Sequence, residues 1–145
     1  MGGPLSLDHI GYVVEDIASY FEEFLRPLCG VDGYAEIYED PLQRVRVAFV
    51  TTSNGVRIEL IEPWGEQSPV RRVLEKKKGG LHHLCFRTDS LDEEIERLTK
   101  LGCMLFSGPT PAVAFGGRRI VFFFTPQSDV IELVECDDRP RNETG

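Results

Sequence analysis

Two histidines and two glutamates occupy matching places in this chain, and side chains of these types can bind a metal ion. His9 and His83 lie in similar segments 74 residues apart, and Glu59 and Glu132 lie in a second pair of similar segments 73 residues apart. Imidazole nitrogen and carboxylate oxygen suit divalent ions such as Zn, Mn, Fe, Co or Ni, whereas a closed structural zinc site ordinarily contains thiolate. Four protein donors on an ion that accepts six would leave adjacent positions for water or substrate.

An internal repeat relates the four residues. The segment Leu7-Asp-His-Ile-Gly recurs as Leu81-His-His-Leu-Cys, and Val56-Arg-Ile-Glu-Leu-Ile-Glu recurs as Asp129-Val-Ile-Glu-Leu-Val-Glu. Two independent segments agree on one period, which indicates a duplicated unit. Taken singly, a strand histidine or a glutamate between two apolar residues is typical of a structural position. If the two halves pack by approximate two-fold symmetry, the two His and two Glu converge, and the repeat therefore favours the metal site.

Each copy predicts the element order β-α-β-β-β. In the first copy, Asp16 can cap a helix with apolar residues at helical spacing, and Pro27 and Gly30 end it. In the second copy, Ser90 and Glu93 match a capping box at the start of a helix. The three strands after each helix are expected at about 34–39, 45–51 and 56–62, and at about 103–107, 118–125 and 130–136.

The two copies divide the chain into modules. The turn Ser53-Asn54-Gly55 predicts a hairpin, and Ser68-Pro69 predicts the start of a short helix between the copies. We expect a single α+β domain over residues 1–145. Its parts are module one at about 5–62, a linker helix segment at about 63–80, module two at about 81–136, and a disordered tail at 137–145.

Composition excludes several classes of protein. The formal net charge of −8 repels phosphate backbones, so we expect no nucleic-acid partner. The longest apolar run, Ile120–Phe124, is far shorter than the roughly 18 residues of a membrane span, so we expect no membrane partner. The first residues lack the pattern of a signal peptide, which predicts a cytoplasmic protein. The four separated cysteines are expected to be buried thiols rather than disulfide partners or thiolate metal ligands.

The repeated modules, the opening Leu7-Asp-His-Ile-Gly, the later Gly80-Leu-His-His and the Ile-Glu-Leu near the end of each copy resemble the vicinal oxygen chelate superfamily. This superfamily includes glyoxalase I, methylmalonyl-CoA epimerase, extradiol dioxygenases and antibiotic-resistance proteins. Residues 59–70 and 74–83 look most like the methylmalonyl-CoA epimerases. The resemblance implies a glyoxalase-like fold, in which two paired βαβββ modules form a curled mixed sheet around a metal cup. It also implies one divalent metal ion (Zn, Co, Ni, Mn or Fe) bound by His9, Glu59, His83 and Glu132.

The same resemblance implies the chemistry. A divalent ion in such a cup stabilises the enolate that forms when a proton leaves the carbon alpha to a carbonyl. Glu132 or Glu59 would act as the catalytic general base. The implied function is that of a metal-dependent epimerase or isomerase acting on a small-molecule acyl-CoA or other thioester, in a homodimer. The alternatives are a glyoxalase I-type lactoylglutathione lyase, a dioxygenase of the same superfamily, and a binding or resistance protein.

One residue departs from the epimerase pattern. The epimerases carry a glutamate at the position of Leu42, and leucine cannot transfer a proton. Another acid, such as Glu39, Asp40 or a ligand glutamate, would then take the role, or the substrate differs.

Three further residues near the expected site have two interpretations each. Arg118 and Arg119 follow two glycines and could bind a carboxylate or phosphate, or could simply begin a strand. His82 precedes His83, so strand alternation predicts that it points to the opposite face and has a structural role.

Overall fold

The protein is described by a computed structural model over residues 4–34 and 36–136. Eight strands form one mixed sheet in the order β2-β3-β4-β1-β5-β8-β7-β6. The strands are β1 (Ser6–Val13), β2 (Tyr38–Asp40), β3 (Val45–Thr51), β4 (Arg57–Pro63), β5 (Gly80–Thr88), β6 (Met104–Pro111), β7 (Arg119–Phe124) and β8 (Val130–Glu135). The helical segments are α1 (Ile17–Tyr20), the π turn η1 (Phe21–Leu25), α2 (Arg26–Cys29), α3 (Arg71–Lys77), α4 (Leu91–Lys100) and the short η2 (Val113–Phe115).

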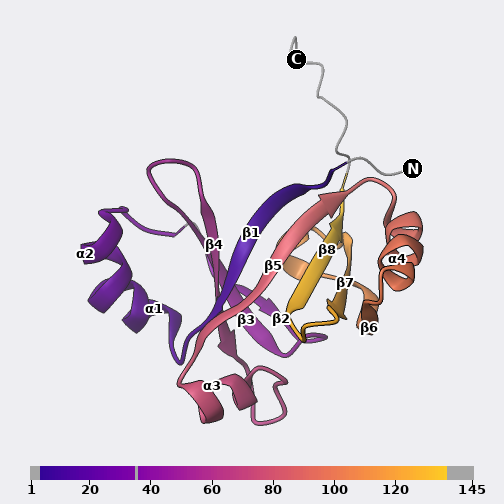
Figure 1. The fold of residues 1–145 in the computed structure, drawn as a ribbon. Helices are drawn as coiled ribbons and strands as arrows, with labels where there is room; N and C mark the ends of the chain where they lie inside the picture. The colour runs from indigo at the N-terminus through magenta and orange to yellow at the C-terminus, as the bar shows by residue number, and fades with distance from the viewer. Residues whose placement is uncertain (1–3, 35, 137–145) are drawn as a thin grey trace.

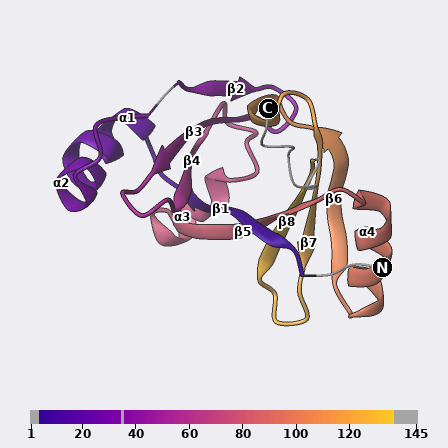
Figure 2. The ribbon, with the colours of Figure 1, turned by 90° about the horizontal axis from the view of Figure 1, so that it is seen from above.

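The sheet has an approximate two-fold arrangement about its centre. β1 and β5 pair antiparallel, β4 lies parallel to β1 on one side, and β8 lies parallel to β5 on the other. The remaining strands extend outward in the same order in both modules, and the sheet curls around a concave face (Figures 1 and 2). The predicted fold class, two βαβββ modules in a curled mixed sheet, is confirmed.

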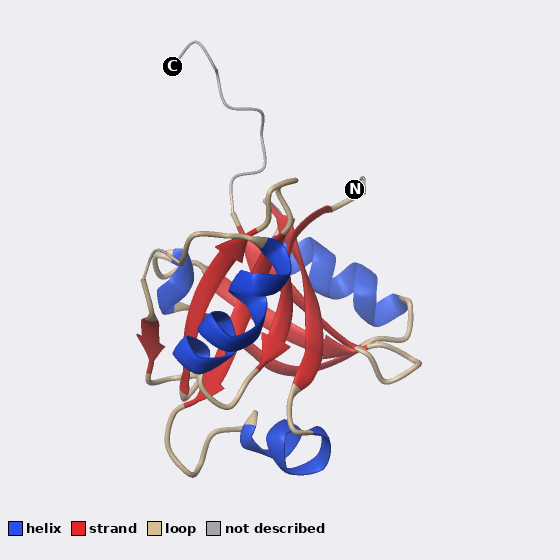
Figure 3. Cartoon of the chain, turned by 90° about the vertical axis from the view of Figure 1, so that its left-hand side faces the viewer, coloured by secondary structure: helices blue, strands red, loops and turns tan. Residues whose placement is uncertain are grey.

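Helices cover the outer face of the sheet. The run α1–η1–α2 lies across the sheet (Figure 3). It packs Ile17, Phe21 and Leu25 against β3 and β4, and α4 packs Leu91 against β7 and β8. Because side chains alternate along a strand, the same strands present their other residues to the concave face. Val47 of β3 is one of these, and it lines the cavity described below.

The local signals for two elements are confirmed. The Asp16 side chain accepts a hydrogen bond from the Ser19 amide at the start of α1, and Gly30 ends the helical run in the left-handed conformation. Gly55 has a φ of 89° in the turn between β3 and β4, where a residue with a side chain would be strained. The predicted hairpin therefore forms.

Other local predictions were wrong. Among the described residues of the strand expected at 34–39, only 38 and 39 are in a strand, which is β2 (Tyr38–Asp40). The first helix continues through Pro27, although proline has no amide hydrogen to donate. The π turn directly before it already interrupts the regular helical hydrogen bonding, so the helix tolerates the proline. Phe24 and Leu28 are among the apolar residues at helical spacing in this segment, and both are exposed.

Two predicted caps also do not form. The linker helix begins at Arg71, because Ser68 belongs to a preceding turn in which its carbonyl accepts from the Arg71 amide. Ser90 stands at the start of α4, but its hydroxyl donates to the Asp89 carboxylate and makes no cap. At Ser90 a hydrogen bond to the neighbouring side chain replaces the capping bond, whereas the Ser68 hydroxyl is buried and bonds to no group in the described part of the chain.

The carboxylate of Asp40 connects the two modules through hydrogen bonds to backbone amides of both. One of its carboxylate oxygens accepts from the amides of Leu42 and Gln43 at 3.1 Å each, and the other accepts from the amide of Val113 at 3.2 Å. Asp40 is 4% exposed, so these bonds are shielded from water. The carboxylate thus holds η2 of module two against the turn after β2.

Replacing Asp40 by alanine is expected to lower the free energy of unfolding by about 2–3 kcal/mol, because buried amides lose a charged acceptor. Denaturant unfolding measures this change. The matched control is Glu39→Ala, whose half-exposed ion pair with Arg46 contributes less than about 1 kcal/mol. Equal losses in the two variants would contradict the role of Asp40.

Several further expectations concern the chain as a whole. Within the described ranges, no helix has the length and apolar character to cross a membrane. The four cysteines form no disulfide within the described residues, but only Cys85 is buried, so the expectation of buried thiols was wrong for the other three. The predicted tail at 137–145 lies outside the described residues. The homodimer and the cytoplasmic location stay predictions.

Candidate metal centre

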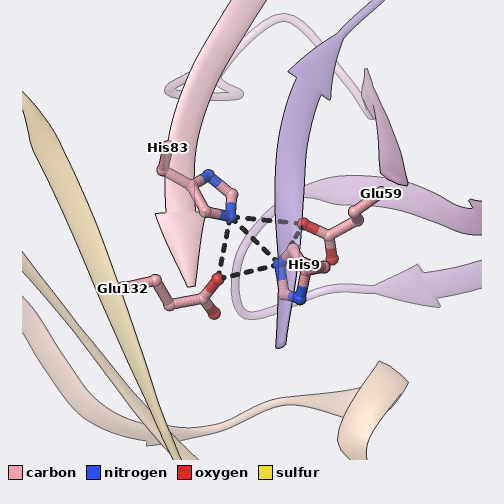
Figure 4. Close-up of side chains that lie close together, drawn as sticks. All are labelled: His9, Glu59, His83 and Glu132. Carbon is pink, nitrogen blue, oxygen red and sulfur yellow. Dashed lines mark hydrogen bonds and ion pairs between the residues drawn. The ribbon is translucent and has the colours of Figure 1, made fainter. Parts of the chain in front are cut away.

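The four predicted ligand residues come together at the middle of the sheet, on its concave face. They lie on the four central strands, His9 on β1, Glu59 on β4, His83 on β5 and Glu132 on β8 (Figure 4). Gly11 pairs with both Glu59 and His83, and its counterpart in the second copy pairs with both Glu132 and His9. All four side chains are buried. We call them the His–Glu cluster.

The spacing of the donor atoms in the His–Glu cluster fits a single ion. The Nε2 atoms of His9 and His83 are 3.2 Å apart. His9 Nε2 lies 3.3 Å from Oε1 of each glutamate, and His83 Nε2 lies 3.4 Å from Glu59 Oε1 and 2.8 Å from Glu132 Oε1. Donors that surround one ion at about 2.0–2.2 Å lie about 2.8–3.6 Å from each other at octahedral or tetrahedral angles. The measured separations fall in that range.

The hydrogen bonding of Glu132 gives a second, independent indication that the His–Glu cluster fits a metal ion. Glu132 is 3% exposed, and within the described chain its Oε1 has no hydrogen-bond partner. His83 Nε2 is near enough for an ion pair but is not placed to make a regular hydrogen bond. A buried carboxylate oxygen without such a bond is costly. A divalent cation among the four donors would satisfy it.

Without a metal, the His–Glu cluster is a set of ion pairs. Burial by itself would lower the pKa of His83, but the negative charge of Glu132 and the contacts with both glutamates raise it to about 9. Burial also opposes ionisation of the glutamates, and the facing histidines nevertheless hold the pKa values of Glu59 and Glu132 below the ordinary range. For His9, the charge of Glu59 and the bond to Asp8 outweigh burial and raise the pKa strongly.

These pKa shifts predict that the stability of the metal-free fold and the affinity for metal change in opposite directions as the pH rises. The raised pKa of His83 stabilises the metal-free fold fully below its ordinary value of 6.5, and this contribution is lost as the pH rises through about 9. The glutamates act in the other direction, since their contribution is present above the ordinary 4.5 and lost at lower pH. The melting temperature of chelator-treated protein should therefore fall between pH 6.5 and 9.

Metal affinity should rise over the same interval, because an ion must displace protons from the histidines. Calorimetric titrations in buffers of different ionisation enthalpy count the protons released. The control for the melting series is His83→Gln, which lacks the titrating ring and should show a weaker decline. A metal-free wild-type protein that gains stability up to pH 9 would contradict the assignment.

Neighbouring residues shape the space around the two rings. The Phe115 ring stacks on His9 with centroids 5.7 Å apart and an angle of 19°. A Cβ atom at Gly11 would lie 2.6 Å from His83 Nε2 and 2.5 Å from its Nδ1. Position 11 therefore needs a glycine, because any side chain there would overlap the His83 ring.

The His–Glu cluster opens into a cavity of about 1040 Å³. Its walls are largely apolar, with Val47 and Ile61 on one side and Ile120 and Phe122 on the other. Cationic side chains of α3 line part of the same cavity, namely Arg72, Lys76 and Lys77. A ligand can thus place a small polar group at the cluster and an apolar or anionic portion along the walls.

Three other residues considered from the sequence, Leu42, Arg118 and Arg119, are not among the described residues that line the cavity. Leu42 is 67% exposed and is not among the described residues that line the cavity, whereas Asp40 in the same turn does line it. Arg119 pairs with both carboxylate oxygens of Glu135 at 2.9 and 2.7 Å, so its guanidinium is already engaged. Arg118 does not belong to the described lining either. The interpretation of these arginines as strand-start residues fits the structure.

Sequence reasoning missed two polar partners of the ligand histidines. Asp8 Oδ2 lies 2.7 Å from His9 Nδ1, and His82 Nδ1 lies 2.8 Å from His83 Nδ1. The prediction that His82 points to the opposite face was wrong, because a β-bulge interrupts the alternation there. Burial and the charge of His83 lower the pKa of His82 to about 4, so its ring stays neutral at physiological pH. The signal in the sequence was that both copies carry a polar residue before the histidine.

Comparison with known proteins supports the same family. Residues 8–122 match the model of the Glyoxalase/Bleomycin resistance protein/Dioxygenase superfamily. The chain is 33% identical to the uncharacterized protein YqjC of Bacillus subtilis, over 94% of this chain and 96% of that protein. It is 29% identical to the ethylmalonyl-CoA/methylmalonyl-CoA epimerase of Cereibacter sphaeroides, over 80% of this chain and 85% of that protein.

A solved structure is also similar over most of its length. It is a variant of Streptomyces coelicolor methylmalonyl-CoA epimerase in complex with 2-nitronate-propionyl-CoA, 29% identical, with a TM-score of 0.73 over 91% of this chain and 98% of that chain.

Proposed function

Since this chain belongs to the Glyoxalase/Bleomycin resistance protein/Dioxygenase superfamily, we propose that it is a metal-dependent epimerase that acts on the carbon alpha to the thioester carbonyl of a small acyl-CoA. The observation that carries the proposal is the His–Glu cluster, four buried donors at the spacing of one ion, which open into a large cavity. The similarity to epimerases of malonyl-type thioesters supports the substrate class.

In this proposal His9, Glu59, His83 and Glu132 hold one divalent ion. When bound, the ion supplies Lewis-acid stabilisation of the oxygen on which negative charge develops. The set contains no thiolate, so Zn, Co, Ni, Mn and Fe all remain compatible with it.

The residues of the chain then carry out the proton transfer. The bond between hydrogen and the alpha carbon breaks, its electron pair moves toward the thioester oxygen, and a glutamate carboxylate accepts the proton. The carboxylate releases this proton to solvent, and a solvent-derived proton is delivered to the opposite face of the same carbon. Glu59 and Glu132 each place Oε1 in the cluster and reach it from different modules. The apolar walls keep the developing charge in surroundings where electrostatic interactions are less screened.

Glu39 and Asp40 are the other acids considered for this role. Glu39 is half-exposed and pairs with Arg46, and the contacts of Asp40 favour a structural role. Both of its carboxylate oxygens already accept bonds from backbone amides. Leu42 lies in the same turn and cannot transfer a proton. We therefore assign the acid–base chemistry to the two glutamates of the His–Glu cluster.

The test is proton exchange in deuterated water. Metal-loaded protein and one epimer of methylmalonyl-CoA or ethylmalonyl-CoA are incubated, and NMR and mass spectrometry follow the alpha position. The expected result is one deuterium at that carbon together with formation of the other epimer, both abolished by chelator and restored by added metal. No exchange into either thioester at any of the five metals would overturn the proposal.

The alternative functions would each give a different result when the metal-loaded protein is assayed with other substrates. Conversion of a glutathione hemithioacetal would indicate the lyase, oxygen consumption with a catechol the dioxygenase, and tight binding without turnover a binding protein. The dioxygenase is disfavoured because it would ordinarily use two histidines and one carboxylate. In this chain, the second carboxylate takes a position that oxygen would need.

A further inference from the structure

Both central strands are irregular at the residue that precedes the ligand histidine. In the pairing of β1 with β5, Leu7 faces Phe86 and His9 faces Cys85, so Asp8 has no partner in the register. Further along, Gly11 faces His83 and Tyr12 faces Leu81, so His82 has none. One extra residue on one strand is a β-bulge, which re-aims side chains. The two modules thus carry equivalent bulges.

Each bulge places a polar group against the outer nitrogen of a ligand ring. The Asp8 carboxylate lies 2.7 Å from Nδ1 of His9, and Nδ1 of His82 lies 2.8 Å from Nδ1 of His83. The inner nitrogens, Nε2 of both ligand rings, face the glutamates. A hydrogen bond at one ring nitrogen decides which nitrogen carries the proton.

We propose that Asp8 and His82 are positioning residues, which accept a hydrogen bond from Nδ1 of His9 and His83 and thereby keep Nε2 of each ring unprotonated and directed at the metal. This inference rests on the proposed metal centre but not on the proposed reaction. Metal-ligating histidines ordinarily have such a partner at the other nitrogen, and its loss costs about 10–100-fold in metal affinity.

Asp8 and His82 differ in charge and surroundings, and this difference predicts which substitution weakens metal binding more. Arg57 NH1 lies 3.0 Å from Asp8 Oδ2, and Arg87 NH1 lies 3.9 Å from Asp8 Oδ1. The carboxylate is therefore anchored, and its charge makes His9 a stronger ligand. His82 is an imidazole and lines the cavity. The loss of Asp8 should accordingly weaken metal binding more than the loss of His82.

The experiment measures the affinity for Zn²⁺ by competition with a chelating indicator. Asp8→Ala and His82→Ala should bind about 10–100-fold more weakly than wild type. His82→Asn keeps an acceptor near the position of Nδ1 and should recover most of the affinity. The control is Asp92→Ala, which removes an 82% exposed carboxylate from α4. Melting of each metal-free variant separates weaker binding from unfolding.

A second measurement needs no variant. In zinc-loaded wild-type protein, ¹⁵N imidazole shifts should show Nδ1 protonated and Nε2 bound to metal for both ligand histidines. Binding through Nδ1, or alanine variants with wild-type affinity and shifts, would overturn the positioning role. Wild-type protein that binds no Zn²⁺ would overturn the metal centre and this inference with it. Protein that binds Zn²⁺ as expected but exchanges no alpha proton would contradict only the reaction.

Discussion

Glu132→Gln is expected to lower the rate of alpha-proton exchange by about 10²–10⁴-fold at saturating metal, because an amide cannot accept the proton. The substitution keeps the size of the side chain and one oxygen that can still reach the ion. The measurement is deuterium incorporation per mole of bound metal, so that a loss of metal is not mistaken for a loss of catalysis.

The same measurement on Glu59→Gln decides which glutamate removes the proton. The variant that loses exchange while it retains metal identifies the base, and the other should show mainly a lower metal affinity. Glu135→Gln is the matched control on β8, where Glu135 pairs with Arg119. Exchange at the wild-type rate in both cluster variants would remove the glutamates from the mechanism.

Gly11→Ala is expected to weaken metal binding by 100-fold or more, which exceeds the roughly 10–100-fold cost of losing a partner of a ligand. The added Cβ would lie within 2.6 Å of His83 Nε2. A contact this close forces the ring away from the other three donors. Chelator competition measures the affinity, and Co²⁺ absorption reports whether the coordination geometry has changed.

The metal-free Gly11→Ala protein should keep most of its stability, because the displaced ring can move toward the cavity. Gly33→Ala is the control, since a Cβ there would meet no described atom within 4 Å and no unusual φ is required. Unchanged Zn²⁺ affinity in Gly11→Ala would mean that His83 is not a ligand in the orientation described.

The repeat predicted the element order of each module and, with two-fold packing, the convergence of the four donors, while the curled mixed sheet was predicted from the family resemblance. Once His9 matches His83 and Glu59 matches Glu132, two-fold packing brings all four to the strands nearest the symmetry axis. The structure has this arrangement, with β1 and β5 at the centre and β4 and β8 beside them. Long-range geometry was therefore predictable because it follows from symmetry.

Local geometry was predictable where few residue types fit, as at the Asp16 cap of α1. Gly55 met this condition in a turn with positive φ. The cap expected from Ser90 failed because its hydroxyl bonds to the Asp89 carboxylate instead, a choice that the sequence does not decide. The cap expected from Ser68 failed because the residue lies in a turn before the helix, where its hydroxyl has no partner within the described residues. The bulges at Asp8 and His82 were missed for a related reason, since period-two alternation assumes a regular strand.

The central pairing of β1 with β5 has a consequence for the origin of the site. Each module contributes one imidazole and one carboxylate, so neither holds a full set of ligands by itself. A half-length ancestor that associated with its own copy along the first strand would have assembled two of each at the junction. Fusion of the two copies then freed each half to diverge, as the aspartate and histidine preceding the two ligand rings now differ.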